Sequence, residues 1–258
     1  MANKPKRHLV IPDCQIRPGV SSEYVDWFAK YAVEKKPDVI LIGGDWADMP
    51  SLSSYDVGKK SFEGRTYRED ILAANDALQR FMAPIEQERE RLTRRRQKHW
   101  NPRLIFTTGN HEDRISRAIE TDRKLDGLIS LEDLFFKQFG FEVYPFLQPV
   151  IVDGIAYAHF FCSGIMGRPV TTARALLTKK HMSCIAFHQP GYDVATDIKA
   201  DGQRITAIIT GSAYPEPLDY LNAQTNNHWR GILMCNEVQD GSFDEMKVSL
   251  DYLKRKYA

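Results

Sequence analysis

The sequence predicts an α/β fold with a parallel sheet, and three observations lead to this prediction. Short β-branched runs alternate with longer segments of helical periodicity in the first half of the chain. Polar motifs follow three of these runs directly, at the positions where parallel strands present their ligands. The length of 258 residues, with 43% hydrophobic and 27% charged residues, is enough for one α/β domain with a full core.

The first elements form a strand–helix–strand unit. We expect a strand at residues 7–12, a helix at 22–35 that begins at Ser21 or Ser22, and a second strand at 39–42. A unit of this kind favours a parallel sheet with ligands at the carboxyl ends of its strands.

A long segment separates the second strand from a third apolar run at 104–107. Residues 50–68 are polar and contain glycine, which is typical of a loop. Residues 69–98 have an apolar stripe at helical spacing, so they predict one long helix or two, with a kink at Pro84 as a further expectation. We therefore expect a helical insertion at about 50–100 within a single domain that spans residues 1–258.

The second half is richer in strands. A helix after Glu112 is expected to end at about 122, a second helical stretch lies near 130–138, and another helix lies near 171–181. Asp153-Gly154 joins two apolar runs as a tight hairpin. The expected strands are at 142–145, 149–153, 155–160, 183–188, 205–210, 230–238 and 246–253.

Charge and cysteine content limit the class of protein. The net charge of +1 gives no overall basic footprint for nucleic acid, although a local basic patch is compatible with it. None of the four cysteines forms a C-x-x-C pair, which argues against a zinc knuckle and favours buried thiols in a reducing compartment. The apolar stretch near the N-terminus is too short for a signal peptide, and no run reaches membrane-spanning length. We therefore expect a cytoplasmic protein that does not contact membranes.

Metal-ligand residues occur as an ordered series along the chain. Asp13-Cys14-Gln15, Gly44-Asp45-Trp46-Ala47-Asp48 and Gly109-Asn110-His111-Glu112 each follow a β-branched run, and His159 and His188 come later. Carboxylate and amide oxygens combined with imidazoles are the ligands that a pair of divalent cations requires. The series therefore predicts a centre for two divalent cations.

The order of these motifs resembles the calcineurin-like metallophosphoesterase superfamily, whose pattern is D-x-H, G-D-x-x-D, G-N-H-[DE], H and G-H-x-H. The chain departs from the pattern at Gln15, where the family usually has histidine, and at Pro190, where the last histidine is missing. Variants with D-x-Q, and with a later motif such as Asn227-His228-Trp229-Arg230-Gly231, look like a group common in bacteriophage genomes. The resemblance implies a four-layer α-β-β-α sandwich, in which two mixed sheets pack face to face between outer helices.

The resemblance also implies which residues hold the metals. Asp45 would bridge both cations, Asp13 and Gln15 would hold the first, and Asn110, His159 and His188 would hold the second. The loss of two histidines leaves an oxygen-rich first site, which favours Mn²⁺, or Mg²⁺ or another transition metal, over zinc. His228 is a candidate substitute ligand at that site, and the alternatives are a substrate contact or a surface histidine.

Two further sets of residues are expected to serve the reaction. The resemblance implies that His111 donates a proton to the leaving oxygen and that Asp48 orients it and raises its pKa. Arg114, Arg168 and Arg230 are candidate substrate-binding residues, because guanidinium groups pair with phosphate. Arg117, on the same expected helix as Arg114, is better explained as part of a solvated helix face.

The sequence thus predicts a dinuclear metal-dependent phosphoesterase that uses metal-activated water. A phosphodiesterase or nuclease acting on DNA or another nucleic acid is favoured, because the segment Arg89–Lys98 is strongly basic and the motifs resemble those of the phage group. A phosphomonoesterase acting on nucleotides or phosphoproteins is the enzymatic alternative. A non-catalytic binding scaffold with a degenerate metal site is the alternative outside enzymes. The sequence gives no prediction of oligomeric state.

Overall fold

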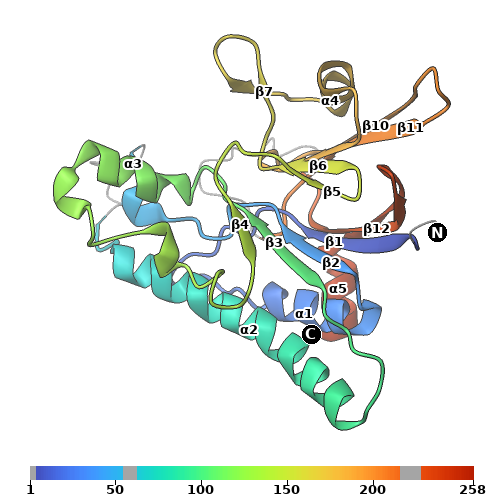
Figure 1. Ribbon diagram of the computed structural model, residues 1–258. Coiled ribbons are helices and arrows are strands. Elements are labelled where there is room, and N and C mark those ends of the chain that lie inside the picture. The colour runs from blue at the N-terminus through green and yellow to red at the C-terminus, as the bar shows by residue number, and fades with distance from the viewer. Residues whose placement is uncertain (1–3, 55–62, 216–227) are drawn as a thin grey trace.

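A computed structural model describes residues 4–54, 63–215 and 228–258, and two large sheets organise them (Figure 1). The first sheet has the strand order β13-β12-β1-β2-β3-β4. The neighbours from β1 to β4 pair in parallel, whereas β12 is antiparallel to both β1 and β13. The strands span β1 (Lys6–Ile11), β2 (Val39–Ile42), β3 (Arg103–Thr107), β4 (Glu142–Tyr144), β12 (Gly231–Gln239) and β13 (Ser242–Ser249).

The second sheet has the order β10-β11-β9-β6-β5. Its strands span β5 (Val150–Val152), β6 (Ile155–Ala158), β9 (Cys184–Ala186), β10 (Tyr192–Ile198) and β11 (Arg204–Thr210). Strands β6, β9 and β11 run parallel, and the hairpin predicted at Asp153-Gly154 joins the antiparallel strands β5 and β6. A two-stranded ribbon of β7 (Cys162–Ser163) and β8 (Arg168–Pro169) follows β6.

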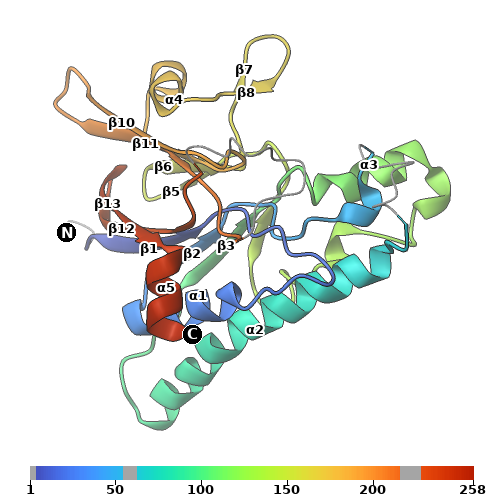
Figure 2. The same ribbon diagram turned by 180° about the vertical axis from the view of Figure 1, so that it is seen from behind.

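Helices cover the outer face of each sheet, which confirms the predicted four-layer sandwich (Figures 1 and 2). On the first sheet lie α1 (Tyr24–Lys35), α2 (Tyr67–Arg94) and α5 (Leu250–Tyr257). On the second lies α4 (Ala173–Lys180), and α3 (Asp113–Thr121) projects beside the sandwich. From one face of the molecule to the other, the layers are therefore helices, the first sheet, the second sheet and a helix.

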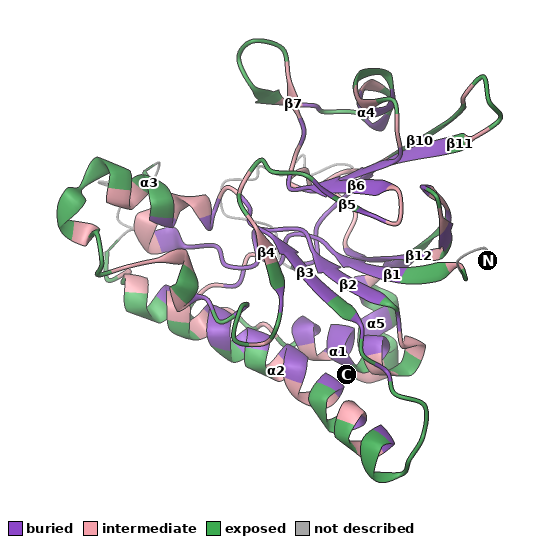
Figure 3. Cartoon of the chain, in the orientation of Figure 1, coloured by how far each residue is buried: buried purple, intermediate pink, exposed green. Residues whose placement is uncertain are grey.

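The strands in the middle of the sandwich are mostly buried (Figure 3), and their side chains alternate between the cores on the two sides of each sheet. In β1, Leu9 and Ile11 join the cluster under the helices, while Val10 between them joins the cluster between the sheets. In β2, Ile40 and Leu41 divide in the same way. This division follows because successive side chains of a strand point to opposite faces. A third cluster fills the space between the second sheet and α4.

Two predicted elements in the chain are wrong. The helix expected at 130–138 is only a 3-10 turn at Leu131–Asp133, because Phe136 is buried against Phe106, with the two rings stacked at 3.7 Å. The strand expected at 246–253 ends at Ser249, whose side chain accepts a hydrogen bond from the amide of Tyr252 and begins α5.

Other boundaries differ less. The segment at 69–98 forms one helix, α2, which continues through Pro84 and ends at Arg94. The loop predicted at 50–68 contains a 3-10 turn at Pro50–Leu52, and its residues 55–62 lie outside the described part. Strand β10 was not predicted. No helix among the described residues is both long enough and apolar enough to cross a membrane.

Candidate metal centre

The strand ends bring the sequence motifs to one edge of the sandwich. In the first sheet Ile11 pairs with Ile42 and Ile42 pairs with Phe106, so β1, β2 and β3 end at the same level. In the second sheet Ala158 pairs with Ala186, so His159 and His188 follow at a shared level as well. Parallel strands in register thus gather residues that are more than a hundred positions apart.

Backbone hydrogen bonds fix the loops against one another. The amides of Cys14 and Gln15 donate to the carbonyl of Asp45, and the amide of His111 donates to Asp45 Oδ1 at 2.9 Å. Asp45 has a φ of 47°, in the left-handed region that non-glycine residues rarely adopt. Gly44 before it is tightly enclosed, because a Cβ there would lie 2.6 Å from the amide nitrogen of Gly109.

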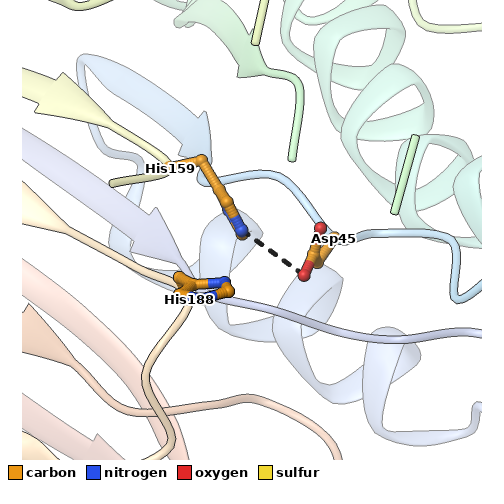
Figure 4. A group of neighbouring side chains, drawn as sticks. All are labelled: Asp45, His159 and His188. Atoms are coloured by element: carbon orange, nitrogen blue, oxygen red, sulfur yellow. Dashed lines mark ion pairs between the residues drawn. The ribbon is translucent and has the colours of Figure 1, made fainter. Parts of the chain in front are cut away.

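Ligand atoms of Asp45, His159 and His188 lie within 4.8 Å of one another (Figure 4). His159 Nε2 lies 3.4 Å from Asp45 Oδ2 and 2.9 Å from Asn110 Oδ1. Imidazole, carboxylate and amide oxygen therefore face a common point, as ligands of a divalent cation do. Within the described residues this is the one cluster of three or more histidine, cysteine or acidic side chains with such spacing.

His159 is held in the orientation that a ligand needs. Its Nδ1 donates to the carbonyl of Gly43 at 2.9 Å, which leaves Nε2 directed at the carboxylate. Burial lowers the pKa of His159, but the charge of Asp45 and their hydrogen bond outweigh it and raise the pKa to about 9. A proton on His159 Nε2 thus lies between Asp45 Oδ2 and Asn110 Oδ1, where a cation would bind.

Glu112 ties the second and third motifs together, a role that the sequence reasoning missed. Its Oε2 accepts from the amides of Asp45 and Gly109 at 2.9 and 2.8 Å, and its Oε1 accepts from the amide of Ala47 at 2.9 Å. The side chain is fully buried, and burial raises the pKa of Glu112. Its place at the end of the third motif was the available signal, but sequence alone does not show which amides a buried carboxylate reaches.

His111 and Asp48 lie beside the cluster and contact each other. His111 Nδ1 lies 2.9 Å from Asp48 Oδ1 and 2.7 Å from the Asp48 carbonyl, so Nδ1 carries the proton. Nε2 points toward Asp45 Oδ2 at 3.7 Å and Arg114 Nη2 at 3.3 Å. Burial lowers the pKa of His111, but the charge of Asp45 and the hydrogen bond with Asp48 raise it above its ordinary value overall.

The side of the centre formed by Asp13 and Gln15 is less complete. Asp13 is buried and accepts from the amide of His188 at 3.2 Å, and burial raises its pKa to about 7. Gln15 Oε1 is buried without a hydrogen-bond partner among the described residues. Because an unpaired buried carbonyl oxygen is costly, its presence here fits a cation ligand.

The structure does not bring His228 into this cluster. Its backbone bridges that of Gly191, and the amide of the next residue, Trp229, donates to the carbonyl of Pro190 at 3.0 Å. His228 therefore lies beside the position where the family pattern has its last histidine. His228 also lines a separate cavity of about 600 Å³, and its Nδ1 has no hydrogen-bond partner among the described residues.

The predicted arginines lie in three different places. Arg114 lines a groove of about 770 Å³ that also contains Asn110 and His188. Arg168 is exposed on β8, and Arg230 lines the same cavity as His228. Arg117, which the sequence assigned to a solvated face, lines the groove and donates to the carbonyl of Asn110 at 3.0 Å.

Comparison with known proteins identifies a family for this chain. The model of the calcineurin-like phosphoesterase family matches residues 6–179, which is more than half of the chain and includes the motifs from Asp13 to His159. No curated protein matches the chain.

Proposed function

The chain belongs to the calcineurin-like phosphoesterase family, and we propose that it is a phosphodiesterase that acts on nucleic acid with two divalent cations. Family membership and the clustered ligands support a metal-dependent phosphoric ester hydrolase. The observation that carries the proposal is the convergence of Asp45, Asn110 and His159 on one point beside His188. The specific reaction, the metal and the substrate are inferred from the chemistry of the side chains.

The residues divide into two half-sites that share Asp45. The first half-site consists of Asp13 and Gln15 with Asp45. The second half-site adds three residues to Asp45, namely Asn110, His159 and His188. When bound, the cations supply Lewis acidity and lower the pKa of a coordinated water. Mn²⁺ suits this set best, since oxygen ligands predominate and imidazoles supplement them.

His111 is proposed to protonate the leaving oxygen from Nε2. Asp48 holds Nδ1–H, so the ring cannot rotate and Nε2 remains directed toward the centre. The charge of Asp45 and the hydrogen bond with Asp48 raise the pKa of His111 above its ordinary value, which favours the protonated ring that a proton donor needs. Arg114 donates to the carbonyls of Asp48 and Met49 at 2.8 and 3.1 Å, so it braces this pair and faces the groove.

The support for nucleic acid comes from the groove rather than from the basic end of α2. That end leads through residues 95–102 into the beginning of β3, whereas the metal motif follows the end of β3. The basic segment therefore lies at the opposite edge of the sheet (Figure 2). The groove, by contrast, begins at Asn110 and His188 and combines arginines with aromatic side chains.

The test combines metal content with hydrolysis. Metal per chain is measured by mass spectrometry after Mn²⁺ loading, and bis-nitrophenyl phosphate is compared with nitrophenyl phosphate. Two Mn²⁺ per chain with preference for the diester supports the proposal. Preference for the monoester would replace it with a phosphomonoesterase, and loaded protein that hydrolyses neither substrate would indicate a scaffold.

A further inference from the structure

Two aromatic side chains in the groove have no role in the cores. Phe146 and Phe160 are half-buried, line the groove and belong to none of the three hydrophobic clusters of the described residues. Large aromatic residues in a folded domain usually contribute to a core. Their placement in the groove therefore requires another explanation.

The two rings form a continuous wall that begins at a metal ligand. Their ring centroids are 5.4 Å apart in an edge-to-face arrangement. The ring of Phe160 lies 5.1 Å from that of His188, and the ring of Phe146 lies 6.2 Å from that of His159. An apolar surface thus begins next to the position where the phosphoester would react.

The other wall of the groove carries balanced charge. Arg117 Nε lies 3.1 Å from Asp113 Oδ2, and Arg114 is engaged with the carbonyls of Asp48 and Met49. Asp122 also lines this wall. Duplex DNA is bound mainly through rows of cations that neutralise its phosphates, and the described lining has no such row. The aromatic faces are therefore the part of the groove best suited to recognise the substrate beyond its phosphate.

We propose that Phe146 and Phe160 form a stacking platform for the nucleobase next to the scissile phosphate, in which one ring stacks on the face of the base and the other, at 83° to it, contacts the edge of the base. The substrate is then a nucleotide unit with an unpaired base. This inference rests on the proposed phosphodiesterase function. Aromatic side chains stack on bases of any sequence, because every base has a π-face. A base within a duplex is stacked on both sides and cannot reach the rings, whereas a base in a single strand or at a frayed end can.

The wild-type enzyme alone provides the first test. Thymidine dinucleotide is compared with two analogues in which one nucleotide, on either side of the phosphodiester, lacks its base. With Mn²⁺, we expect kcat/KM to fall roughly 10-fold for at least one analogue, which is the scale of one base stack. Equal kcat/KM for all three compounds would overturn the stacking platform but not the proposed phosphodiesterase activity. If the enzyme hydrolyses none of the three compounds and does not hydrolyse bis-nitrophenyl phosphate either, the proposed function itself is overturned.

Substitutions then locate the effect. Phe146→Ala should remove most of the difference between the dinucleotide and its abasic analogue, and Phe146→Tyr should retain it. Phe135→Ala, an exposed phenylalanine that does not line the groove, is the matched control and should leave the difference unchanged. If the rings merely shield the ligand histidines, Phe146→Ala would lower Mn²⁺ content and slow all substrates equally, and that result would overturn the platform.

Discussion

The two half-sites proposed for the metal centre differ in how their polar atoms are satisfied. In the second half-site, His159 bonds to Gly43 and Asn110, and Glu112 accepts three amides of the supporting loops. At the proposed first half-site, by contrast, the buried Gln15 Oε1 has no hydrogen-bond partner among the described residues. Ser212 Oγ, next to the residue whose amide bonds to Asp13, has none there either.

Backbone hydrogen bonds connect the segment that contains Ser212 to Asp13. The amide of Ala213 donates to the carbonyl of Asp13 at 2.8 Å, and the amide of Ser212 donates to the carbonyl of Trp229 at 3.1 Å. Buried polar atoms are normally paired, because each unpaired one costs about 1–3 kcal/mol. The comparison teaches that the protein's own hydrogen bonds hold the loops of the second half-site, whereas the first retains an unpaired side-chain oxygen, Gln15 Oε1, that a bound cation would satisfy.

Asp45→Asn tests the residue common to both half-sites, and it should have the largest effect. Loss of one carboxylate charge weakens both cations and removes several kcal/mol of transition-state stabilisation, so hydrolysis should fall about 1,000-fold or more. Bis-nitrophenyl phosphate turnover and Mn²⁺ content measure the two effects, with the exposed Asp76→Asn as the control. Near-normal turnover with two bound Mn²⁺ would contradict the shared role.

His111→Ala separates the proton donor from the ligands of either half-site. Turnover should fall about 100-fold, because general acid catalysis contributes on that scale, while Mn²⁺ content stays at the wild-type value. The loss should be smaller for a nitrophenyl ester than for a dinucleotide, since nitrophenolate leaves without protonation. The exposed His99→Ala is the control. Loss of a metal in His111→Ala would show that the imidazole is a ligand instead.

Glu112→Gln tests the preorganisation of the second half-site. The amide group cannot accept at both of its ends, so at least one of the three loop amides loses its partner. Mn²⁺ affinity at the second half-site should fall about 10-fold, as for other groups that orient metal ligands, and the Tm should fall as well. Calorimetric titration and thermal unfolding measure these changes. Glu120→Gln, which changes an exposed residue on α3, is the control and should alter neither the Mn²⁺ affinity nor the Tm. If Glu112→Gln keeps the wild-type affinity and Tm, Glu112 does not hold the loops of the second half-site in place.

The strands that carry the motifs were predictable from the sequence, because β-branched runs and the residues after them are local signals. The runs before Asp13, Asp45 and Asn110 form β1, β2 and β3. Strand β10 escaped prediction because it pairs only with β11 at the edge of its sheet, so much of its surface stays exposed and polar. Helix α5 was not predicted because it follows β13 directly, without a glycine or proline between them. The one local signal of its start is the N-cap at Ser249.

The contacts of the site were less predictable than its residues. Motif order identified the side chains near Asp45, but not the three amides that Glu112 accepts. Phe146 and Phe160 carry no motif and meet only because their loops lie at the same edge of the sandwich. His228 is far along the chain from the other ligands, and only the pairing with Gly191 shows which position it neighbours.

The pH dependence of metal binding should also distinguish the half-sites. In metal-free protein, Asp13 has a pKa of about 7 and His159 a pKa of about 9, and each must lose its proton to bind a cation. Affinity should therefore rise with pH by up to about 10-fold per unit, levelling off above pH 7 at the first half-site and only above pH 9 at the second. Mn²⁺ titrations from pH 6 to 9.5, in buffers of different ionisation enthalpy, measure both the affinity and the released protons. A single common plateau would show that the half-sites do not differ in this way.

The smallest expected effect is that of His228→Ala, and it decides how the first half-site is completed. His228 neighbours the backbone of Gly191 but lines a separate cavity, so its ring must turn toward Asp13 to serve as a ligand. If it does, the variant should weaken only the weaker of the two Mn²⁺ binding steps, by a few-fold to about 10-fold, because one imidazole is lost from a weak site. If the ring only touches substrate, both binding steps should match the wild type and KM alone should rise. Calorimetric titration of Mn²⁺ into metal-free wild type, His228→Ala and the control His99→Ala separates these outcomes. Identical two-step isotherms would exclude ligation by His228, and a single tight step in all three proteins would show that the second half-site alone holds a permanent cation.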